Sequence, residues 1–158
     1  MKADGTGIKI RRMCEADLDE VMAIAAGLKD SPQWARAAYV SALDKGATPR
    51  RIALIAEDAE SGAVLGFAVA CLFPPQGELE SIAVFEAEQR RGIGRRLVSA
   101  LLKELKAAGV DEVLLEVRAS NARAVGFYRS EGWSESGRRP RYYADPEEDA
   151  VLMNLKFD

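Results

Sequence analysis

Apolar residues recur along this chain in two rhythms, one typical of strands and one typical of helices. Short alternating or continuous apolar runs, bounded by glycine, proline and polar turns, predict seven strands: Ile8–Arg12, Arg51–Glu57, Val64–Phe73, Glu78–Phe85, Glu112–Val117, Trp133–Gly137 and Ala150–Phe157. Apolar positions three and four apart predict four helices: Glu15–Leu28, a segment opened by Ser31 and Pro32 that stops near Gly46, Ile93–Gly109, and Ala122–Ser130. We expect the segment Arg138–Glu148 to be a loop.

The order of these elements predicts one mixed α/β domain. Strands outnumber helices, and a strand, a turn, a helix and a second strand form a crossover at the centre. We therefore expect an α+β fold in which about seven strands form a mixed sheet with about four helices. Residues 1–158 should form a single domain, and residues 1–7, which are short and polar, should be flexible.

The most informative stretch, 89–97, lies between the fourth predicted strand and the long helix. Gly92 and Gly94 stand where this helix begins, and the missing Cβ lets the backbone approach a ligand closely. N–H groups in the first helical turn lack helical partners and lie at the positive end of the helix dipole, so they can bind a phosphate group. Arg95 excludes the nucleoside-triphosphatase loop, and Leu97 excludes the dinucleotide fingerprint. The alternative is a basic helix start with two tolerated glycines.

Composition limits the catalytic mechanisms and metal sites that are possible. The chain has 158 residues, 48% of them apolar and 30% charged, and no histidine. The absence of histidine excludes Ser-His-Asp and Cys-His catalysis and most zinc sites, so a general base must be a carboxylate, Lys, Tyr, Cys or water. Cys14 and Cys71 follow no metal or redox spacing, and we expect no metal.

Charge and hydropathy address possible partners. The net charge of −3 argues against sequence-independent binding of nucleic acid over the whole surface. The N-terminal segment Met1–Gly7 has no apolar stretch of signal-peptide type, and no span in the chain approaches membrane length. We therefore expect a cytoplasmic protein with no nucleic-acid or membrane partner, as a monomer or a weak homodimer.

Glu116 and Tyr128 are the candidate catalytic residues. Glu116 stands near the end of a strand that should pair close to the one before the glycine turn, where strand ends border a binding crevice. A glutamate on an exposed strand face is equally compatible with this pattern. Tyr128 follows one helix later, and it could be a core aromatic packed beside Phe127 and Trp133.

Two motifs together resemble the Gcn5-related N-acetyltransferase superfamily. The first, Gln/Arg-x-x-Gly-x-Gly at 89–94, resembles the superfamily's loop for the pyrophosphate of coenzyme A. The second runs from Asn121 to Trp133 as Asn-x-x-Ala-x-x-Phe-Tyr-x-x-x-Gly-Trp. Residues 79–155 also look like the bacterial ribosomal-protein-alanine N-acetyltransferases, which acetylate the N-terminal alanine of ribosomal protein S18.

The resemblance implies acetyl-CoA as co-substrate and a protein N-terminus as acceptor, with Glu116 as general base and Tyr128 as general acid. It also implies roles for further residues: the backbone of Ile82, Ala83 and Val84 beside the pantetheine arm, Arg90, Arg91, Gly92, Ile93, Gly94 and Arg95 on the pyrophosphate, Asn121 hydrogen-bonded to the cofactor, and Arg141, Tyr142 and Tyr143 around the peptide. Pro140 departs from that group's pattern, which bears on the acceptor peptide more than on the chemistry.

The choice of acceptor depends on amine pKa. An α-amino group has a pKa near 7.7–8.0, so roughly a third is neutral at pH 7.5, whereas about one lysine in a thousand is neutral. A single glutamate therefore suits an N-terminal acceptor better than a lysine. A lysine or small-amine acetyltransferase and a non-catalytic coenzyme-A-binding module are the alternatives. Arg138, Arg139 and Arg141 could be a solvated charge run or could bind RNA, but the two tyrosines beside them favour peptide.

Overall fold

The computed structural model describes residues 7–89, 91–144 and 146–157. Within them, seven strands form one sheet: β1 (Ile8–Arg12), β2 (Arg50–Asp58), β3 (Val64–Phe73), β4 (Gln76–Val84), β5 (Glu112–Arg118), β6 (Ser134–Ala144) and β7 (Glu147–Lys156). The described residues also form four α-helices: α1 (Leu18–Ala26), α2 (Arg36–Leu43), α3 (Ile93–Ala107) and α4 (Ala122–Ser130). The predicted α+β fold class is confirmed.

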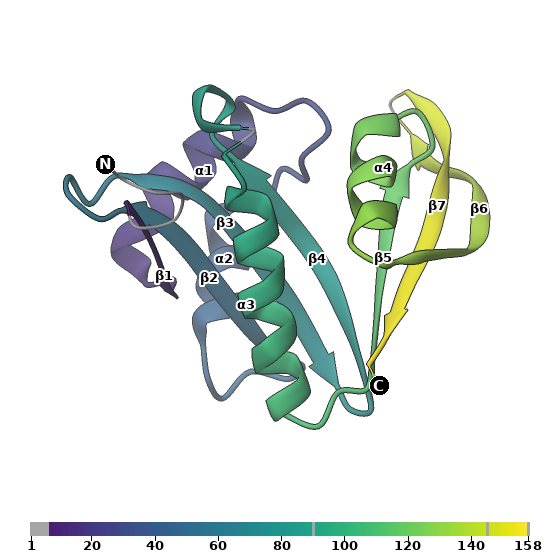
Figure 1. Cartoon of the computed structure of the whole chain (residues 1–158), viewed down its shortest axis with the longest axis horizontal. Helices are drawn as coiled ribbons and strands as arrows, with labels where there is room; N and C mark the ends of the chain where they lie inside the picture. Colours follow the sequence, from purple (N-terminus) through teal and green to yellow (C-terminus); the bar gives the residue numbers. More distant parts are fainter. Residues whose placement is uncertain (1–6, 90, 145, 158) are drawn as a thin grey trace.

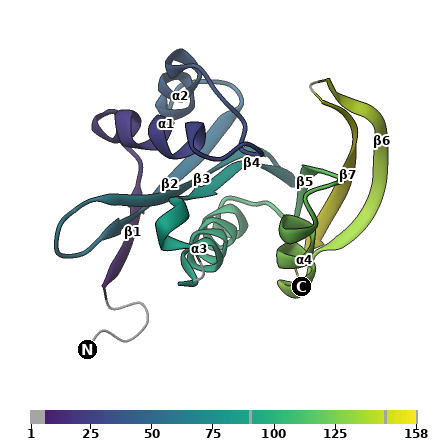
Figure 2. The ribbon, with the colours of Figure 1, turned by 90° about the horizontal axis from the view of Figure 1, so that it is seen from above.

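The sheet has the strand order β1-β2-β3-β4-β5-β7-β6, in which β4 and β5 are parallel and the other neighbours are antiparallel. Helices α1 and α2 cover one face of the sheet, and α3 and α4 lie on the other (Figures 1 and 2). Strands β2 and β3 form a hairpin, and the predicted crossover through α3 is present. The chain thus places its glycine turn beyond the end of β4, the central strand of the sheet.

Each face of the sheet has its own hydrophobic core. Leu97, Leu101 and Leu105 recur at helical spacing along α3 and are almost fully buried against one face. Leu18 and Tyr39, from α1 and α2, are buried against the other face. Because both faces are covered, the central strands β2 and β3 are nearly continuous apolar runs.

Strands β4 and β5 pair over a short distance and then separate. Their parallel register covers three pairs, the last of which joins Glu78 to Leu114. Beyond this pair the two strands diverge like the arms of a fork (Figure 1). On the other side of β4, the register with β3 shifts so that Glu80 is an extra residue between Leu79 and Ser81. Such a bulge bends a strand and increases its twist, which helps β4 turn away from β5.

The second helix begins later than the sequence predicts. Ser31 and Pro32 were expected to open it, but α2 starts at Arg36. The side-chain amide of Gln33 donates hydrogen bonds to the carbonyls of Ala25, at 2.6 Å, and Ser31, at 2.9 Å. These bonds tie the segment to the end of α1, so a cap-like Ser-Pro sequence here leads into a non-helical connection.

The prediction that Arg138–Glu148 is a loop is wrong. Strand β6 continues through most of this segment to Ala144 and pairs with β7. The register jumps between Arg139 and Tyr143, which leaves two extra residues on β6, and Pro140 lies within this bulge. Arg141, also in the bulge, has a positive φ of 52°. Proline and clustered charge predicted a loop, whereas pairing with β7 stabilises a bulged strand.

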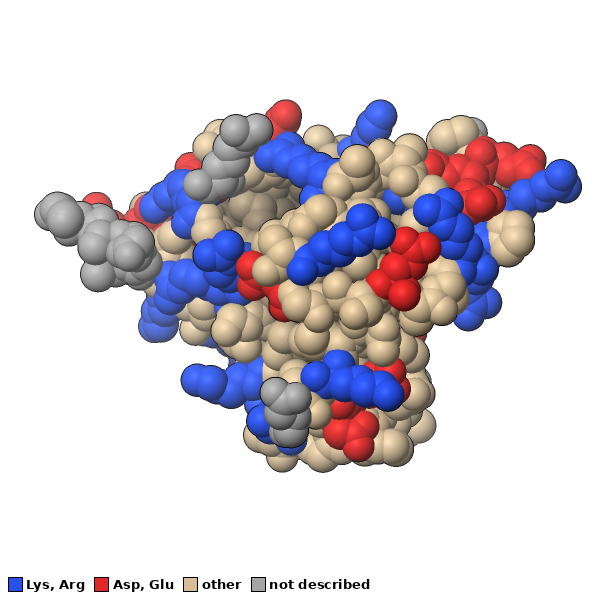
Figure 3. Space-filling model, turned by 45° about the vertical axis from the view of Figure 1, so that its right-hand side comes forward, with Lys and Arg blue, Asp and Glu red and all other residues tan. Residues whose placement is uncertain are grey.

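Acidic and basic side chains are interspersed over the face shown in Figure 3. Many arginines in the described part of the chain form an ion pair with a carboxylate, including Arg51 with Glu80 at 2.8 Å. No helix in residues 7–89, 91–144 or 146–157 is both long and apolar enough to cross a membrane.

Candidate active site

A cavity of about 1050 Å³ opens where β4 and β5 part, and we call it the fork cavity. Its walls come from β4, the start of α3, the start of α4 and the connection between α1 and α2, so it touches elements from both faces of the sheet. Nine residues predicted for the site line it: Ile82, Ala83, Val84, Gly92, Ile93, Gly94, Arg95, Asn121 and Tyr128. Arg91 and Glu116 are not among its lining residues, and Arg90 lies outside the described residues.

The open edge of β4 presents backbone groups to the fork cavity. The N–H of Phe85 donates to the carbonyl of Leu65 on β3, at 2.8 Å. Strand alternation therefore turns the N–H groups of Ile82 and Val84 to the opposite side, where β5 no longer pairs. Consistent with this, the Val84 carbonyl accepts a hydrogen bond from the Gln89 side chain at 3.1 Å. An extended ligand could bind this edge as an added strand does.

The glycine turn forms the next part of the wall. Gly92 has φ +79°, a left-handed conformation that side chains rarely adopt, and it is the N-cap of α3. The N–H of Arg96 bonds to the Gly92 carbonyl at 3.1 Å, so the N–H groups before it have no helical acceptor. A Cβ on Gly94 would lie 3.9 Å from Val84 Cγ2 and 4.0 Å from Phe127 Cζ, so Gly94 leaves open the space between them.

The cationic side chains around this turn and its cavity differ in whether they form ion pairs. Arg95 pairs with Glu131 at 3.0 Å, and Arg91 pairs with Glu88. Lys29 and Arg123 also line the fork cavity, and neither has an ion-pair partner among the described residues. Sequence reasoning missed both. They come from the α1–α2 connection and the exposed first turn of α4, where no local pattern distinguishes them from other surface cations.

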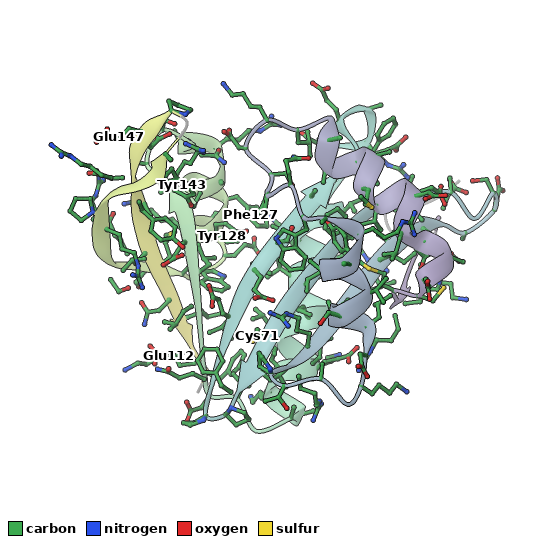
Figure 4. All side chains as sticks on the ribbon, turned by 180° about the vertical axis from the view of Figure 1, so that it is seen from behind. Cys71, Glu112, Phe127, Tyr128, Tyr143 and Glu147 are labelled. Atoms are coloured by element: carbon green, nitrogen blue, oxygen red, sulfur yellow. The ribbon has the colours of Figure 1, made fainter. Side chains whose placement is uncertain are left out.

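Tyr128 combines packing with access to the cavity. Its side chain is buried, with ring centroids 5.2 Å from Phe127 and 5.4 Å from Trp133. Figure 4 shows Phe127 and Tyr128 between the parted strands. Burial raises the pKa of Tyr128 far above the usual tyrosine value, so its hydroxyl is protonated at neutral pH. Asn121 caps α4 by accepting the N–H of Ala124 at 3.1 Å, and it also lines the fork cavity.

Glu116 lies on the face of β5 that is opposite the core packed against α3. Its neighbours Leu115 and Val117 are buried in the α3-side core, so strand alternation turns Glu116 toward the side of α1 and α2. It stands two residues beyond Leu114, the last β5 residue paired with β4. Its Oε2 is 2.7 Å from Arg139 Nε. Glu116 is therefore just past the point where the fork opens.

Two carboxylates on β4 accompany Glu116, and we call Glu78, Glu80 and Glu116 the carboxylate cluster. Burial, together with the charges of Glu80 and Glu116, raises the pKa of Glu78 above its ordinary value. Arg51 binds Glu80 through two hydrogen bonds, at 2.8 and 3.2 Å. A cluster with more carboxylates than nearby guanidinium groups favours a cationic ligand.

The basic and aromatic run on β6 divides among different partners. Arg138 pairs with Glu135 at 3.4 Å and Arg141 with Glu147 at 3.0 Å, whereas Arg139 pairs with Glu116. Arg141 is 82% exposed and directed to the end of the hairpin, away from the carboxylate cluster. These three arginines lie close together in the sequence, but strand alternation separates Arg138 from Arg139, and Arg141 lies apart from both in the bulge.

The two tyrosines lie nearer to Glu116. Tyr142 donates a hydrogen bond to Glu116, which raises the pKa of Tyr142. The ring of Tyr143 lies 5.1 Å from that of Tyr142 and 4.3 Å from the guanidinium of Arg118. Burial, with the nearby charge of Glu116, raises the pKa of Tyr143 to about 12. Of the three predicted peptide-site residues, the tyrosines adjoin Glu116 and Arg141 does not.

Comparison with known proteins places this site in a family. Residues 18–133 match the model of the acetyltransferase (GNAT) family. The chain belongs to this family. Its glycine turn and the Asn121–Trp133 segment both fall within the matched range. No group of three or more potential metal-ligating His, Cys, Asp or Glu side chains occurs within residues 7–89, 91–144 and 146–157.

Several GNAT proteins resemble this chain closely. The [ribosomal protein bS18]-alanine N-acetyltransferase of Escherichia coli strain K12 is 41% identical over 98 residues, which cover 61% of this chain and 66% of that enzyme, slightly less than two thirds. The crystal structure of the Escherichia coli ribosomal-protein-S18-alanine N-acetyltransferase matches with a TM-score of 0.81 and 30% identity, covering 96% of this chain and 94% of that one. Naa20 of Chaetomium thermophilum, in complex with a bisubstrate analogue, matches with a TM-score of 0.83 and 25% identity over 94% and 86% of the two chains.

Proposed function

We propose that this protein transfers the acetyl group of acetyl-CoA to the free N-terminal amine of a protein, with the N-terminal alanine of ribosomal protein S18 as the foremost candidate. The observation that carries the proposal is the fork cavity, which runs from a phosphate-suited helix start to a buried, protonated tyrosine. The relatives named for S18-alanine acetylation support the choice of acceptor.

The fork cavity suits acetyl-CoA in shape and in polarity. The open N–H of Ile82 can bind an amide of the pantetheine arm, and the first turn of α3 can bind the pyrophosphate. Acetyl-CoA supplies the thioester whose acetyl group is transferred. The neighbour Naa20 binds a bisubstrate analogue in its own structure, which agrees with two ligands meeting in this fold.

Each proton in the proposed reaction has a carrier. The α-ammonium first releases one proton to solvent, and Glu116, directly or through a water molecule, accepts the second proton, which the nitrogen loses as the neutral amine attacks the thioester carbonyl. The N–H of Val84 polarises that carbonyl. Tyr128 donates its proton to the departing sulfur as the carbon–sulfur bond breaks, and it regains a proton from solvent. The raised pKa of Tyr128 keeps its hydroxyl protonated until that step. No acyl-enzyme forms.

The acceptor would approach from the side of α1, α2 and the β6–β7 hairpin. The carboxylate cluster attracts the positive α-ammonium, and Tyr142 and Tyr143 provide amphipathic surface for the peptide. An α-amine needs little help to lose its first proton near pH 7.5, because roughly a third of it is already neutral, whereas a lysine side chain needs far more. A site with one glutamate at the fork therefore favours an N-terminus.

Acetyl transfer to a short peptide beginning Ala-Arg tests the proposal, with release of free thiol as the readout. The control peptide has a blocked N-terminus and an added internal lysine. We expect acetylation of the free N-terminus alone. Activity on the blocked peptide would make the protein a lysine acetyltransferase. Inactivity on both peptides, with acetyl-CoA binding intact, would point to a small-amine acceptor or to a non-catalytic coenzyme-A-binding module.

A further inference from the structure

The guanidinium of Arg139 lies beside the carboxylate that the proposed function uses as its base. Arg139 Nε is 2.7 Å from Glu116 Oε2, and the Arg139 side chain remains 58% exposed. The guanidinium also lies 5.5 Å from the centre of the Tyr142 ring, which limits its orientation. A guanidinium has five N–H donors, and those on Nη1 and Nη2 make no hydrogen bond with any described residue.

The register of β6 with β7 accounts for the placement of Arg139. Arg139 is the last residue in register with β7 before the two-residue bulge, and it pairs there with Ala150, which in turn pairs with Arg118 of β5. Arg138 lies one step earlier and binds Glu135 on its own strand instead. Strand alternation therefore places one arginine at the carboxylate cluster and its neighbour away from it.

The Nη donors of Arg139, which lie beside Glu116, would face different groups in an N-terminal acceptor and in a lysine acceptor. When an α-amine faces Glu116, the carbonyl of the acceptor's first peptide bond is attached to the adjacent Cα, so its oxygen lies close to the same carboxylate. The amine of a lysine side chain is separated from any carbonyl by a four-carbon stem. A guanidinium held beside Glu116 can therefore bind the first carbonyl of an N-terminal acceptor, but not a carbonyl of a lysine acceptor.

We propose that Arg139 is a specificity-determining residue, whose Nη donors bind the first peptide carbonyl of the acceptor while Nε holds Glu116. This inference rests on the proposed function and adds a reason for selecting an N-terminus that is independent of amine pKa. The bond is a charge-assisted hydrogen bond at a partly exposed site, so its loss should lower kcat/KM for an N-terminal peptide roughly ten- to a hundredfold.

A double-substitution cycle on the whole protein tests the inference. The enzyme is wild type or Arg139→Gln, and the acceptor is a peptide beginning Ala-Arg or the same peptide with its first carbonyl replaced by a methylene group. We expect Arg139→Gln to lower kcat/KM on the normal peptide ten- to a hundredfold and to change kcat/KM on the methylene peptide less than about threefold. Arg139→Lys should fall between the wild type and Arg139→Gln, because lysine retains charge but lacks the fork of donors.

Arg138→Gln is the matched control, since it removes the same charge one residue away, and both kcat/KM values should change less than twofold. If Arg139 only positions Glu116, Arg139→Gln would slow both peptides by the same factor, and the inference would be overturned while the proposed function stands. If the wild type acetylates neither peptide, the proposed function and this inference fail together.

Discussion

The fork cavity and the carboxylate cluster are built in different ways, although they adjoin at the same opening in the sheet. The fork cavity takes its main binding surface from one continuous stretch, β4 through the glycine turn into α3, and largely from backbone groups. The carboxylate cluster and its partners are side chains from β4, β5 and β6, strands brought together only by the folded sheet.

This difference predicts how each region responds to mutation. A surface made of backbone N–H groups is insensitive to most side-chain changes and sensitive to an added Cβ at a glycine. A surface made of charged side chains is sensitive to single neutral substitutions, because every member changes the electrostatic environment of the others. Substitutions in one region should therefore alter one substrate's kinetics and leave the other's unchanged.

The largest effect should follow Glu116→Gln. This substitution keeps the size of the side chain and its contact with Arg139 but removes the proton acceptor, so kcat should fall on the order of a hundred- to ten-thousandfold. Acetyl-CoA binding should stay within about twofold, because Glu116 does not line the fork cavity. Steady-state kinetics and calorimetric titration with acetyl-CoA measure the two quantities. Unchanged turnover would remove Glu116 from the role of base.

Gly94→Ala should produce the converse pattern. The new Cβ would make ordinary contacts near 4 Å with Val84 and Phe127, so the fold accommodates it, and alanine favours the helix by up to about 1 kcal/mol. The same methyl group occupies space that a phosphate needs in order to reach the first turn of α3. We expect the KM for acetyl-CoA to rise about tenfold, with unchanged KM for the peptide and an equal or higher melting temperature.

Gly126→Ala on α4 is the control for this stabilising effect. A Cβ at Gly126 would meet no atom within 4 Å, so the substitution should stabilise the helix without touching either substrate. A rise in the acetyl-CoA KM for Gly126→Ala as well as Gly94→Ala would show that helix stability, rather than space at the turn, controls cofactor binding.

The same contrast explains what the sequence could predict. Gly92 and Gly94 were placed correctly at the helix start, because a local strand–turn–helix pattern determines their surroundings. Residues 138–148 were predicted as a loop, because Pro140 and clustered charge are loop signals when pairing with β7 is unknown. The sequence also could not predict that Arg139 pairs with Glu116, because this contact depends on the register of β5 and β6, the strands on either side of β7.

Residues that line the fork cavity also differ in whether the sequence alone could identify them. Asn121 belongs to a motif, Ile82–Val84 belong to the strand before the glycine turn, and all four residues line the cavity. Lys29 and Arg123 line it too, but each lies in a segment whose sequence resembles any exposed polar surface. Sequence identified the residues whose position is set by nearby chain, and missed those whose position depends on how distant segments pack.

The electrostatics of the carboxylate cluster can be tested through stability. The pKa of Glu78 is raised, so its ionised form costs stability above that pKa, and Glu78→Gln should raise the free energy of unfolding at pH 7.5. The gain should shrink as pH falls through the folded pKa and vanish below the unfolded value near 4.3. Thermal unfolding followed from pH 4 to pH 8 measures this.

Glu112, on the same β5 strand, gives a comparison of opposite sign. Hydrogen bonds from Asn154 and Gln76 lower the pKa of Glu112, so its charge stabilises the fold above the unfolded pKa, and this stability is lost as pH falls through the folded pKa. Glu112→Gln should therefore lower the melting temperature at pH 7.5, with the difference closing toward low pH. If Glu78→Gln and Glu112→Gln changed stability at pH 7.5 in the same direction, the conclusion that burial and mutual repulsion destabilise the carboxylate cluster would be wrong.

Tyr142→Phe should have the smallest effect. It removes one hydrogen bond to Glu116 at a tyrosine that is 49% exposed, where water can replace the lost hydroxyl, so kcat/KM for the peptide should fall only about two- to fivefold. The KM for acetyl-CoA should not change, because Tyr142 does not line the fork cavity. Tyr143→Phe keeps the ring over Arg118, and it is the matched control for general changes in the hairpin. If Tyr142→Phe altered the KM for acetyl-CoA as much as that for the peptide, the two regions would be coupled through Glu116, and the division of the site into a backbone-built half and a side-chain-built half would fail.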